Sequence, residues 1–252
     1  MSSELLSVSE AAKKLGVDPS RIHARIREGS LPAEKVGNQW VITTRDLRLV
    51  MHHAGPGRPL SCKSAWALLA VAANSHAVAE LSPPDRSKAR ARLRDLLADA
   101  SSRVAPEEAV ARIARALGNR AERRLFVASP RDLPDIRNDK RVQPSGVSLP
   151  ESNISAGGSV EGYVWSGEVS PLLHDYLLSP ASRGRANVVL HVVVSADRRC
   201  QAFSLDEAAR SPLALAADLA EYDDVRERGE AMRLLAALQA STNAQPAKAP
   251  RG

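Results

Sequence analysis

Residues 5–42 have the sequence LLSVSEAAKKLGVDPSRIHARIREGSLPAEKVGNQWVI, and this stretch decides the fold of the first part of the chain. Ser7 can cap a helix, and Glu10, three residues later, completes a capping box that satisfies amides left free at a helix start. A helix is therefore predicted over 8–15. Gly16 is expected to end it, because glycine adopts the left-handed conformation common just after a helix.

A second helix and a hairpin are predicted next. Asp18-Pro19 starts the helix, with the aspartate as N-cap and the proline in the first turn, where its missing N–H costs nothing. This helix is expected to reach Glu28. Two short apolar runs separated by a turn-forming tripeptide then predict a β-hairpin. The runs are 35–36 and 40–42, and the tripeptide is Gly37-Asn38-Gln39. Thr44 is expected to cap a short closing helix, 45–51.

Two short helices joined by a glycine-containing turn form a helix-turn-helix, whose second helix enters the major groove of DNA. The apolar seam between the helices is expected to be Ala11, Ala12, Leu15, Ile22 and Ile26. The outward side chains of the second helix are then Ser20, Arg21, His23, Ala24 and Arg27. A bidentate arginine–guanine contact is worth about 1–3 kcal/mol of discrimination. The hairpin is expected to be a wing that touches phosphates or the minor groove with Lys35, Asn38 and Gln39. The alternative interpretation is a solvated arginine face without a ligand.

The same stretch resembles the DNA-binding domain of the excisionase/MerR type. The shared pattern is S-x-x-E-A-A-x-x-L-G-V, then S-x-I-x-x-x-I-x-x-G-x-L-P-A, then K-V-G-x-x-W-x-I. The resemblance implies a winged helix-turn-helix that binds duplex DNA. The sequence departs from the family at Arg25, where a buried aromatic is usual, and at Asn38-Gln39, where basic wing residues are common. The second departure implies weaker phosphate contact through the wing.

Residues 58–240 are similar to actinobacterial antitoxin-like proteins of the abortive-infection (AbiEi) type. The similarity lies in GRPLSCKSAWALLA, RAERRLFVASPRDLPDIRNDKRVQPSG, VEGYVWSGEVSPLLHDYLLSP, NVVLHVVV and ALAADLAEYDDVRERGEAMRLL. This resemblance implies repression of the protein's own operon through the N-terminal domain. It also implies that the rest of the chain neutralises a nucleotidyltransferase-like toxin.

The whole chain is predicted to be a mostly helical α+β protein. The expected parts are a winged helix-turn-helix (1–53), a hinge (54–60), a helical segment (61–120), a mixed α/β domain (121–240) and a disordered tail (241–252). The strongest strand signals are the β-branched runs 160–165 and 188–194, and 125–128 is a further strand. Helices are predicted over 60–78, 86–100, from 106 to 118, 133–137, 171–178 and 213–240, and a loop over 144–159.

Charge is distributed unevenly along the chain. The net charge is +6, and residues 51–145 carry +7 whereas residues 146–252 carry −3. An excess of this kind at one end predicts an anionic partner such as nucleic acid. On a helix, Arg86, Arg90 and Arg94 form a stripe at four-residue spacing. For this stripe and for the run 120–124, phosphate contact and a solvated face are the two alternatives.

No catalytic or metal-binding pattern emerges. His52, His53 and His76 lack the spacing of metal ligands, and Ser145 and Ser148 lack a G-x-S-x-G context. No phosphate-binding glycine loop is found, and Asp223-Asp224 is expected to be a helix cap. We therefore expect no cofactor and no enzyme activity; an active site within 120–240 that escapes motif analysis is the alternative. Cys62 and Cys200 are expected to be free thiols in a reducing cytoplasm, and no run of about 18 apolar residues predicts a membrane helix.

These patterns together predict a sequence-specific DNA-binding regulator. The expected role is a repressor, as the antitoxin of a toxin–antitoxin or phage-defence operon. One small domain contacts little DNA, so a homodimer or cooperative binding through residues beyond 60 is expected. The alternative is an excisionase-like recombination directionality factor that bends DNA, although excisionases are usually far shorter than this chain.

Overall fold

The computed structural model describes residues 5–27, 31–37, 39–44, 46–47, 59–101, 106–154, 157–194, 204–222 and 224–244. Contacts between residues divide the chain into two compact units, Met1–Gly57 and Arg58–Gly252. The fold is α+β, with a helix-turn-helix at its N-terminus. Within the described residues, no helix has the length and apolar character needed to cross a membrane.

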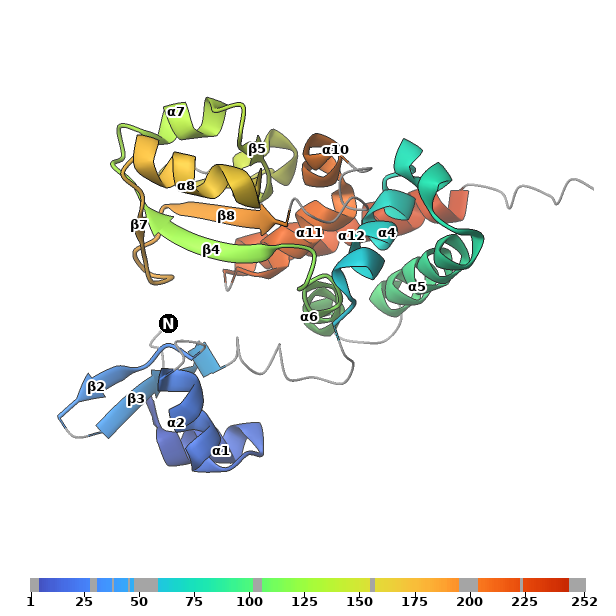
Figure 1. Cartoon of the computed structure of the whole chain (residues 1–252). Helices are drawn as coiled ribbons and strands as arrows, with labels where there is room; N and C mark the ends of the chain where they lie inside the picture. The colour runs from blue at the N-terminus through green and yellow to red at the C-terminus, as the bar shows by residue number, and fades with distance from the viewer. Residues whose placement is uncertain are drawn as a thin grey trace, which may run out of the picture. The chain divides into compact units, whose positions relative to one another are not determined.

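The first unit contains two short helices and a three-stranded antiparallel sheet (Figure 1). Its elements are β1 (Leu5–Ser7), α1 (Val8–Leu15), α2 (Pro19–Arg27), β2 (Glu34–Val36) and β3 (Gln39–Thr43). The central strand is β3, which pairs with β1 on one side and with β2 on the other. The predicted hairpin is therefore present, and β1 is an additional strand that the sequence pattern did not predict.

Two details of the first unit differ from the prediction. Gln39 belongs to β3 and pairs with Val36, so it is not part of the hairpin tip. The hydroxyl of Thr43, not that of Thr44, accepts the hydrogen bond from the amide of Asp46 (3.0 Å). Thr43 is the last residue of β3 and so stands one position closer to the sheet than the predicted cap. Most of the predicted closing helix, 45 and 48–51, lies outside the described residues.

The core of the first unit joins both helices to the sheet. The five residues predicted for the seam between the helices all belong to it: Ala11, Ala12 and Ile22 are buried, and Leu15 and Ile26 are partly buried. The other fully buried members are Leu6, Leu31, Ile42 and Leu47. Alanine at two positions of α1 keeps side chains small where α2 packs against it, so the predicted seam is confirmed.

The second unit combines a group of helices with a five-stranded mixed sheet. Its helices are α4 (Cys62–Ala72), α5 (Pro83–Ser101), α6 (Pro106–Ala116), α7 (Leu133–Asn138), α8 (Ser166–Asp175), α10 (Leu205–Arg210), α11 (Pro212–Ala220) and α12 (Val225–Ala244). Short 3₁₀ helices are η1 (His76–Glu80), η2 (Gly146–Ser148) and η3 (Pro150–Ser152). The strands are β4 (Glu122–Val127), β5 (Gln143–Pro144), β6 (Val160–Trp165), β7 (Ser179–Pro180) and β8 (Val188–Val193).

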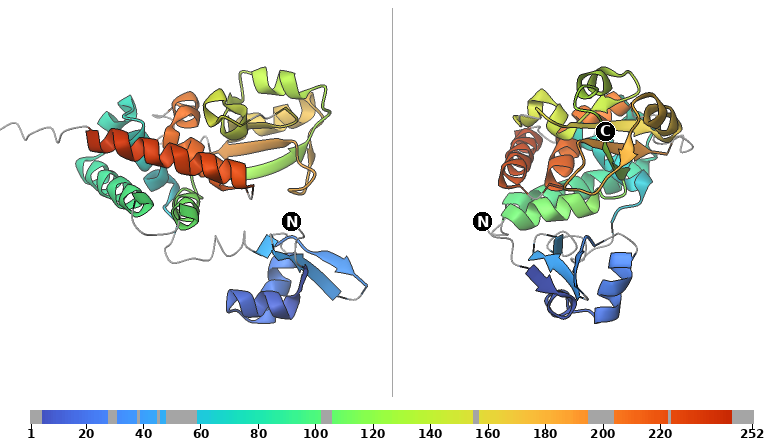
Figure 2. Two further views of the ribbon diagram at one scale, coloured as in Figure 1. Left: turned by 180° about the vertical axis from the view of Figure 1, so that it is seen from behind. Right: turned by 90° about the vertical axis from the view of Figure 1, so that its left-hand side faces the viewer.

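The sheet has the strand order β5-β6-β8-β4-β7. Its central strands β6 and β8 are parallel, and the connection between them includes α8; the other pairs are antiparallel. Side chains alternate along each strand, so one face packs on α7 and α8 and the other faces the helices that include α11 (Figure 1). Figure 2 shows α12 running along the helical half of the unit, beside α11 and α5.

Several predicted boundaries in the second unit are revised. The helix predicted over 60–78 stops at Ala72, because Asn74 has a positive φ of 50° and the chain then continues as η1. The helix predicted over 213–240 is two helices, α11 and α12, and the second continues to Ala244. The segment predicted as a loop, 144–159, contains the end of β5 and two 3₁₀ turns.

The helices of 61–120 do not form a core of their own. Leu68 on α4, Leu93 on α5 and Ile113 on α6 belong to the same cluster of buried residues as Leu215 on α11 and Leu235 on α12. The contacts thus place the predicted helical segment and the predicted mixed domain in one unit. The sequence pattern could not reveal this, because the packing partners are more than 90 residues apart.

Candidate nucleic-acid interface

The first helix of the N-terminal unit is fixed by the predicted capping box. The amide of Ser7 donates to Oε2 of Glu10 (2.8 Å), and the amide of Glu10 donates to the Ser7 hydroxyl (3.3 Å). Hydrogen bonds from Ser7 lower the pKa of Glu10. At the other end Gly16 has φ 63°, and its amide bonds to the last carbonyls of α1. These contacts set the turn that leads into the second helix.

The second helix, α2, begins at Asp18-Pro19 as predicted. Oδ1 of Asp18 accepts a hydrogen bond from the Ser20 amide (2.8 Å), and hydrogen bonds from Ser20 lower the pKa of the aspartate. The helix itself, PSRIHARIR, contains three arginines and no acidic residue. Apart from its cap, α2 is therefore a purely cationic helix.

The predicted DNA-contacting residues of α2 lie on one side of the helix. Ile22 is fully buried and Ile26 is partly buried, which fixes the inner side. Ser20, Arg21, His23 and Arg27 are exposed, and Ala24 is half-buried. At about 100° of rotation per residue, these five positions span an arc of about 160° facing away from the core.

Arg25 occupies the flank of α2 between the two sides. Its side chain is half-buried, and its carbonyl accepts a hydrogen bond from the amide of Leu31 (3.1 Å). Leu31 is itself buried in the core of the unit. The helix thus packs without the aromatic residue that the resemblance led us to expect at this position.

The hairpin presents two of its three predicted contact residues to solvent. Lys35 on β2 and Gln39 on β3 are both exposed, and Asn38 lies outside the described residues. Trp40, opposite Lys35 in the ladder, is half-buried. Gly37 has a positive φ of 61°, which suits a two-residue connection between strands.

The comparison with protein families agrees with this geometry. Residues 5–51 match the model of a family described as a helix-turn-helix domain. No curated protein and no solved structure matches the chain. A helix-turn-helix domain indicates a DNA-binding regulator or an excisionase-like factor, and this function belongs to the first unit.

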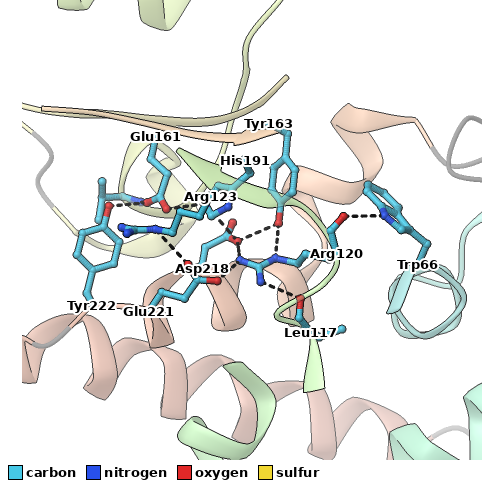
Figure 3. Close-up of polar contacts among 11 residues, drawn as sticks. Trp66, Leu117, Arg120, Arg123, Glu161, Tyr163, His191, Asp218, Glu221 and Tyr222 are labelled. Carbon is cyan, nitrogen blue, oxygen red and sulfur yellow. Dashed lines mark hydrogen bonds and ion pairs between the residues drawn. The ribbon is translucent and has the colours of Figure 1, made fainter. Parts of the chain in front are cut away.

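A second concentration of polar side chains lies inside the second unit (Figure 3). We call it the buried polar cluster. Its members are Arg120, Arg123, Glu161, Tyr163, His191, Asp218, Glu221 and Tyr222. They come from β4, β6 and β8, from the loop before β4, from α11 and from the two residues that follow α11. In the ladder Arg123 is opposite His191, and His191 is opposite Tyr163, so these three form a row across one face of the sheet.

Arg120 is the centre of one half of the cluster. Its Nε donates to the hydroxyl of Tyr163 (2.8 Å), and its Nη1 donates to the carbonyl of Leu117 (3.1 Å). Its Nη2 donates to Oδ1 of Asp218 (2.5 Å) and lies 2.8 Å from Oε1 of Glu221. The Arg120 and Asp218 side chains are 1% and 0% exposed, so both charges must be compensated by neighbours inside the protein. Arg120 has Asp218 and Glu221, and Asp218 has Arg120 and, at 3.7 Å, Nε2 of His191.

Glu161 is the centre of the other half. Its Oε2 accepts hydrogen bonds from the amide of Val147 (3.0 Å) and the hydroxyl of Tyr222 (2.9 Å), and its Oε1 lies 2.8 Å from Nε2 of His191. Gly146, at φ 50°, lies against the same carboxylate, and a Cβ there would overlap it. Described residues therefore surround the Glu161 carboxylate.

The carboxyl groups of the cluster respond differently to burial. Burial opposes ionisation of Glu161, but the hydrogen bond and charge of His191 outweigh it and lower the pKa. Burial likewise opposes ionisation of Glu221, and the charge of Arg120 outweighs it, so the pKa is about 2. At Asp218 burial prevails and raises the pKa.

The cluster corrects one prediction and was itself missed by sequence reasoning. Arg120 and Arg123, for which phosphate contact and a solvated face were the two alternatives, are instead paired inside the protein, Arg123 with Glu221 (3.1 Å). A signal was present: Glu161, His191 and Asp218 are each a lone charged or titratable residue within an apolar run. Such residues are rarely buried without a partner.

The other residues considered as candidates from the sequence do not come together in a site within the described residues. Within the described residues, no group of three His, Cys, Asp or Glu side chains is placed to hold a metal ion. His76 is exposed, Cys62 is a half-buried free thiol, and Asp224 caps α12 through the amide of Arg226 (3.0 Å). Ser148 accepts a hydrogen bond from the Glu161 amide (2.8 Å). The predictions for His52, His53, Cys200 and Asp223 concern residues outside the described ranges.

Proposed function

We propose that the chain is a transcriptional repressor that reads a short sequence of duplex DNA with the exposed side of α2. One observation carries the proposal: Arg21 and Arg27 are exposed on a helix without acidic residues, away from the side that packs Ile22 and Ile26 into the core. Within the described residues neither arginine forms an ion pair, so their guanidinium groups are available to base edges and phosphates.

In this proposal the β2–β3 hairpin acts as the wing of the helix-turn-helix domain. Lys35 and Gln39 are exposed on it, and with Asn38 they supply one cation and two amides for phosphate or minor-groove contact. Ser20, His23 and Ala24 complete the surface of α2. Ala24, half-buried near the centre of the arc, allows a base or a thymine methyl group to approach closely.

The test is genomic footprinting of the full chain beside an Arg21→Ala/Arg27→Ala variant. The variant is expected to lose its peaks while its circular dichroism spectrum stays unchanged, because both side chains are outside the core. Arg131→Ala/Arg185→Ala, which removes two exposed arginines of the second unit, is the charge-matched control and should keep the peaks. Peaks that survive in the α2 variant, or a wild-type protein that binds no duplex at low salt, would refute the proposal.

A single helix-turn-helix domain buries only about 600–1,000 Å² of protein surface on DNA, so we infer that two copies act together. The copies would associate through residues beyond 60, as a dimer or cooperatively along the duplex. Light scattering of the protein with and without a footprinted duplex measures this. A monomer that binds its site one-to-one would exclude it.

The antitoxin role extends the proposal to the second unit and is supported by the resemblance of 58–240 to AbiEi-type proteins. It assigns repression of the chain's own operon to the first unit and neutralisation of a nucleotidyltransferase-like toxin to the second, with no catalytic step. A reporter fused to the chain's own promoter and co-expression with the neighbouring gene test the two halves separately. The alternative, a recombination directionality factor, predicts strong DNA bending in a circular-permutation gel assay.

A further inference from the structure

Helix α5 carries a second concentration of cations, which the proposed function does not use. Ala89, Leu93 and Leu97 are buried and fix its inner side. Four cations on the remaining surface are exposed; we call them the α5 basic face. They are Lys88, Arg90, Arg92 and Arg94.

The α5 basic face differs from the predicted stripe. Arg86 is half-buried, and its Nη2 donates to the carbonyl of Leu81 (3.2 Å), so it does not extend the row formed by Arg90 and Arg94. At about 100° per residue, Lys88 and Arg92 form a second row on the other flank of the exposed surface. The cations therefore stand in two rows along the helix.

Carboxylates compensate this face only in part. The hydrogen bond from Lys63 is the main cause that lowers the pKa of Asp85, and the charge of Lys88 adds a smaller contribution. Asp95 is exposed on the same helix. Within the described part of the chain, Arg90, Arg92 and Arg94 form neither an ion pair nor a side-chain hydrogen bond. Other exposed cations of this unit do find partners. Examples are Arg124 with Glu122, Arg210 with Asp206 and Arg233 with Glu230.

We propose that the α5 basic face binds the phosphate backbone of the duplex that the helix-turn-helix domain reads. The inference rests on the proposed function and adds a sequence-independent contact from the second unit. Residues 88–94 span about 9 Å of helix. Counted over both strands, a duplex carries about five phosphate charges over that length, so phosphates occur at a spacing that the cations of either row can reach. Because both surfaces belong to one chain, DNA held by one meets the other at high effective concentration.

Salt dependence of binding is the measurement that tests this contact. Each phosphate contact contributes about −0.9 to the slope of log K against log salt concentration. We expect Lys88→Gln/Arg90→Gln/Arg92→Gln/Arg94→Gln to make the slope shallower by up to about 3.6, equally on a footprinted duplex and on a scrambled one. Glutamine keeps nearly the same helix propensity, so α5 should remain folded.

A charge-matched control separates a local contact from the effect of net charge. Arg131→Gln/Lys140→Gln/Arg185→Gln/Arg226→Gln removes four exposed cations elsewhere in the second unit and should leave the slope unchanged. If the α5 variant has the wild-type slope, or one no shallower than the control, the inference is overturned. The pair Arg90→Gln/Arg94→Gln repeats the test with a smaller perturbation, in case the fourfold variant does not fold.

The design also separates this inference from the proposed function. Arg21→Ala/Arg27→Ala should lose the preference for the footprinted duplex over the scrambled one, yet keep the part of the slope that depends on α5. A wild-type chain that binds no duplex would overturn the function and the inference together. If the wild-type chain binds DNA and the α5 variant has the same salt slope, the inference alone is overturned.

Discussion

Replacing Arg120 by methionine tests whether the buried polar cluster holds the sheet of the second unit against α11. Methionine fills much of the same volume but removes every donor of the guanidinium group. The hydroxyl of Tyr163 and the carbonyl of Leu117 each lose a hydrogen bond, and Asp218 and Glu221 lose the cation they share. Asp218, which is 0% exposed, then keeps only the hydrogen bond from the Tyr163 hydroxyl (2.9 Å) and the more distant Nε2 of His191 (3.7 Å).

The magnitude follows from this burial. Removing one partner of a buried ion pair costs about 3–5 kcal/mol, because the remaining charge stays desolvated. For a domain of 150–250 residues this corresponds to a fall in Tm of about 6–20 °C. Arg124→Met is the matched control from the same segment: its side chain is 42% exposed and pairs with a Glu122 that is 63% exposed. An exposed pair of this kind contributes about 0–1 kcal/mol.

Urea denaturation of both variants, followed by far-UV circular dichroism, measures the difference. A double-mutant cycle with Asp218→Asn should show coupling of about 0.5–3 kcal/mol, because Arg120 and Asp218 share one hydrogen-bonded network. If Arg120→Met is no more destabilising than Arg124→Met, the pairing inside the cluster does not stabilise this unit. Additive effects at Arg120 and Asp218 would contradict the direct contact itself.

Three further perturbations have expected outcomes in denaturation experiments. Gly146→Ala should cost about 2 kcal/mol or more, since the residue has a positive φ and its new Cβ would overlap the carboxylate of Glu161. Gly167→Ala, whose Cβ meets open space on α8, should instead be neutral or stabilise by up to about 1 kcal/mol. Ser7→Ala should destabilise the first unit by about 0.5–2 kcal/mol through loss of its cap. The lowered pKa of Glu221, about 2 against 4.5, contributes stability above pH 4.5 that is lost as pH falls towards 2, roughly 3 kcal/mol in all. Glu221→Gln should flatten that part of the pH profile.

The helix-turn-helix was predictable because its signals are local. The capping box at Ser7 and Glu10, the left-handed Gly16 and the Asp18 cap each act within a few residues. The additional strand β1 was not, because it is three residues long and its partner β3 lies more than thirty residues away. Its apolar Leu5 and Leu6 give no sign of strand or helix until that partner is present.

In the second unit, more features depend on partners that are far away in the sequence, and these could not be predicted. The strands β6 and β8 were predicted to within one residue, since both are nearly continuous apolar runs. The helix predicted over 171–178 begins five residues earlier, at Ser166, and contains Pro171 in its interior, where proline is disfavoured. The burial of Arg120 could not be predicted, because its partner Asp218 is 98 residues away in sequence.

Whether an arginine in the basic part of this chain can bind a phosphate depends on whether a carboxylate of the protein is close enough to pair with it. Arg120 and Arg123 pair with Asp218 and Glu221, which lie outside residues 51–145, so part of the +7 carried by that range is not available to a ligand. Arg21 and Arg90 have no such partner among the residues that the structure describes, so no described ion pair must be broken there before a phosphate can bind. The electrostatic contribution to DNA binding should therefore follow the number of unpaired exposed cations, and a salt slope calculated from net charge would count the wrong residues.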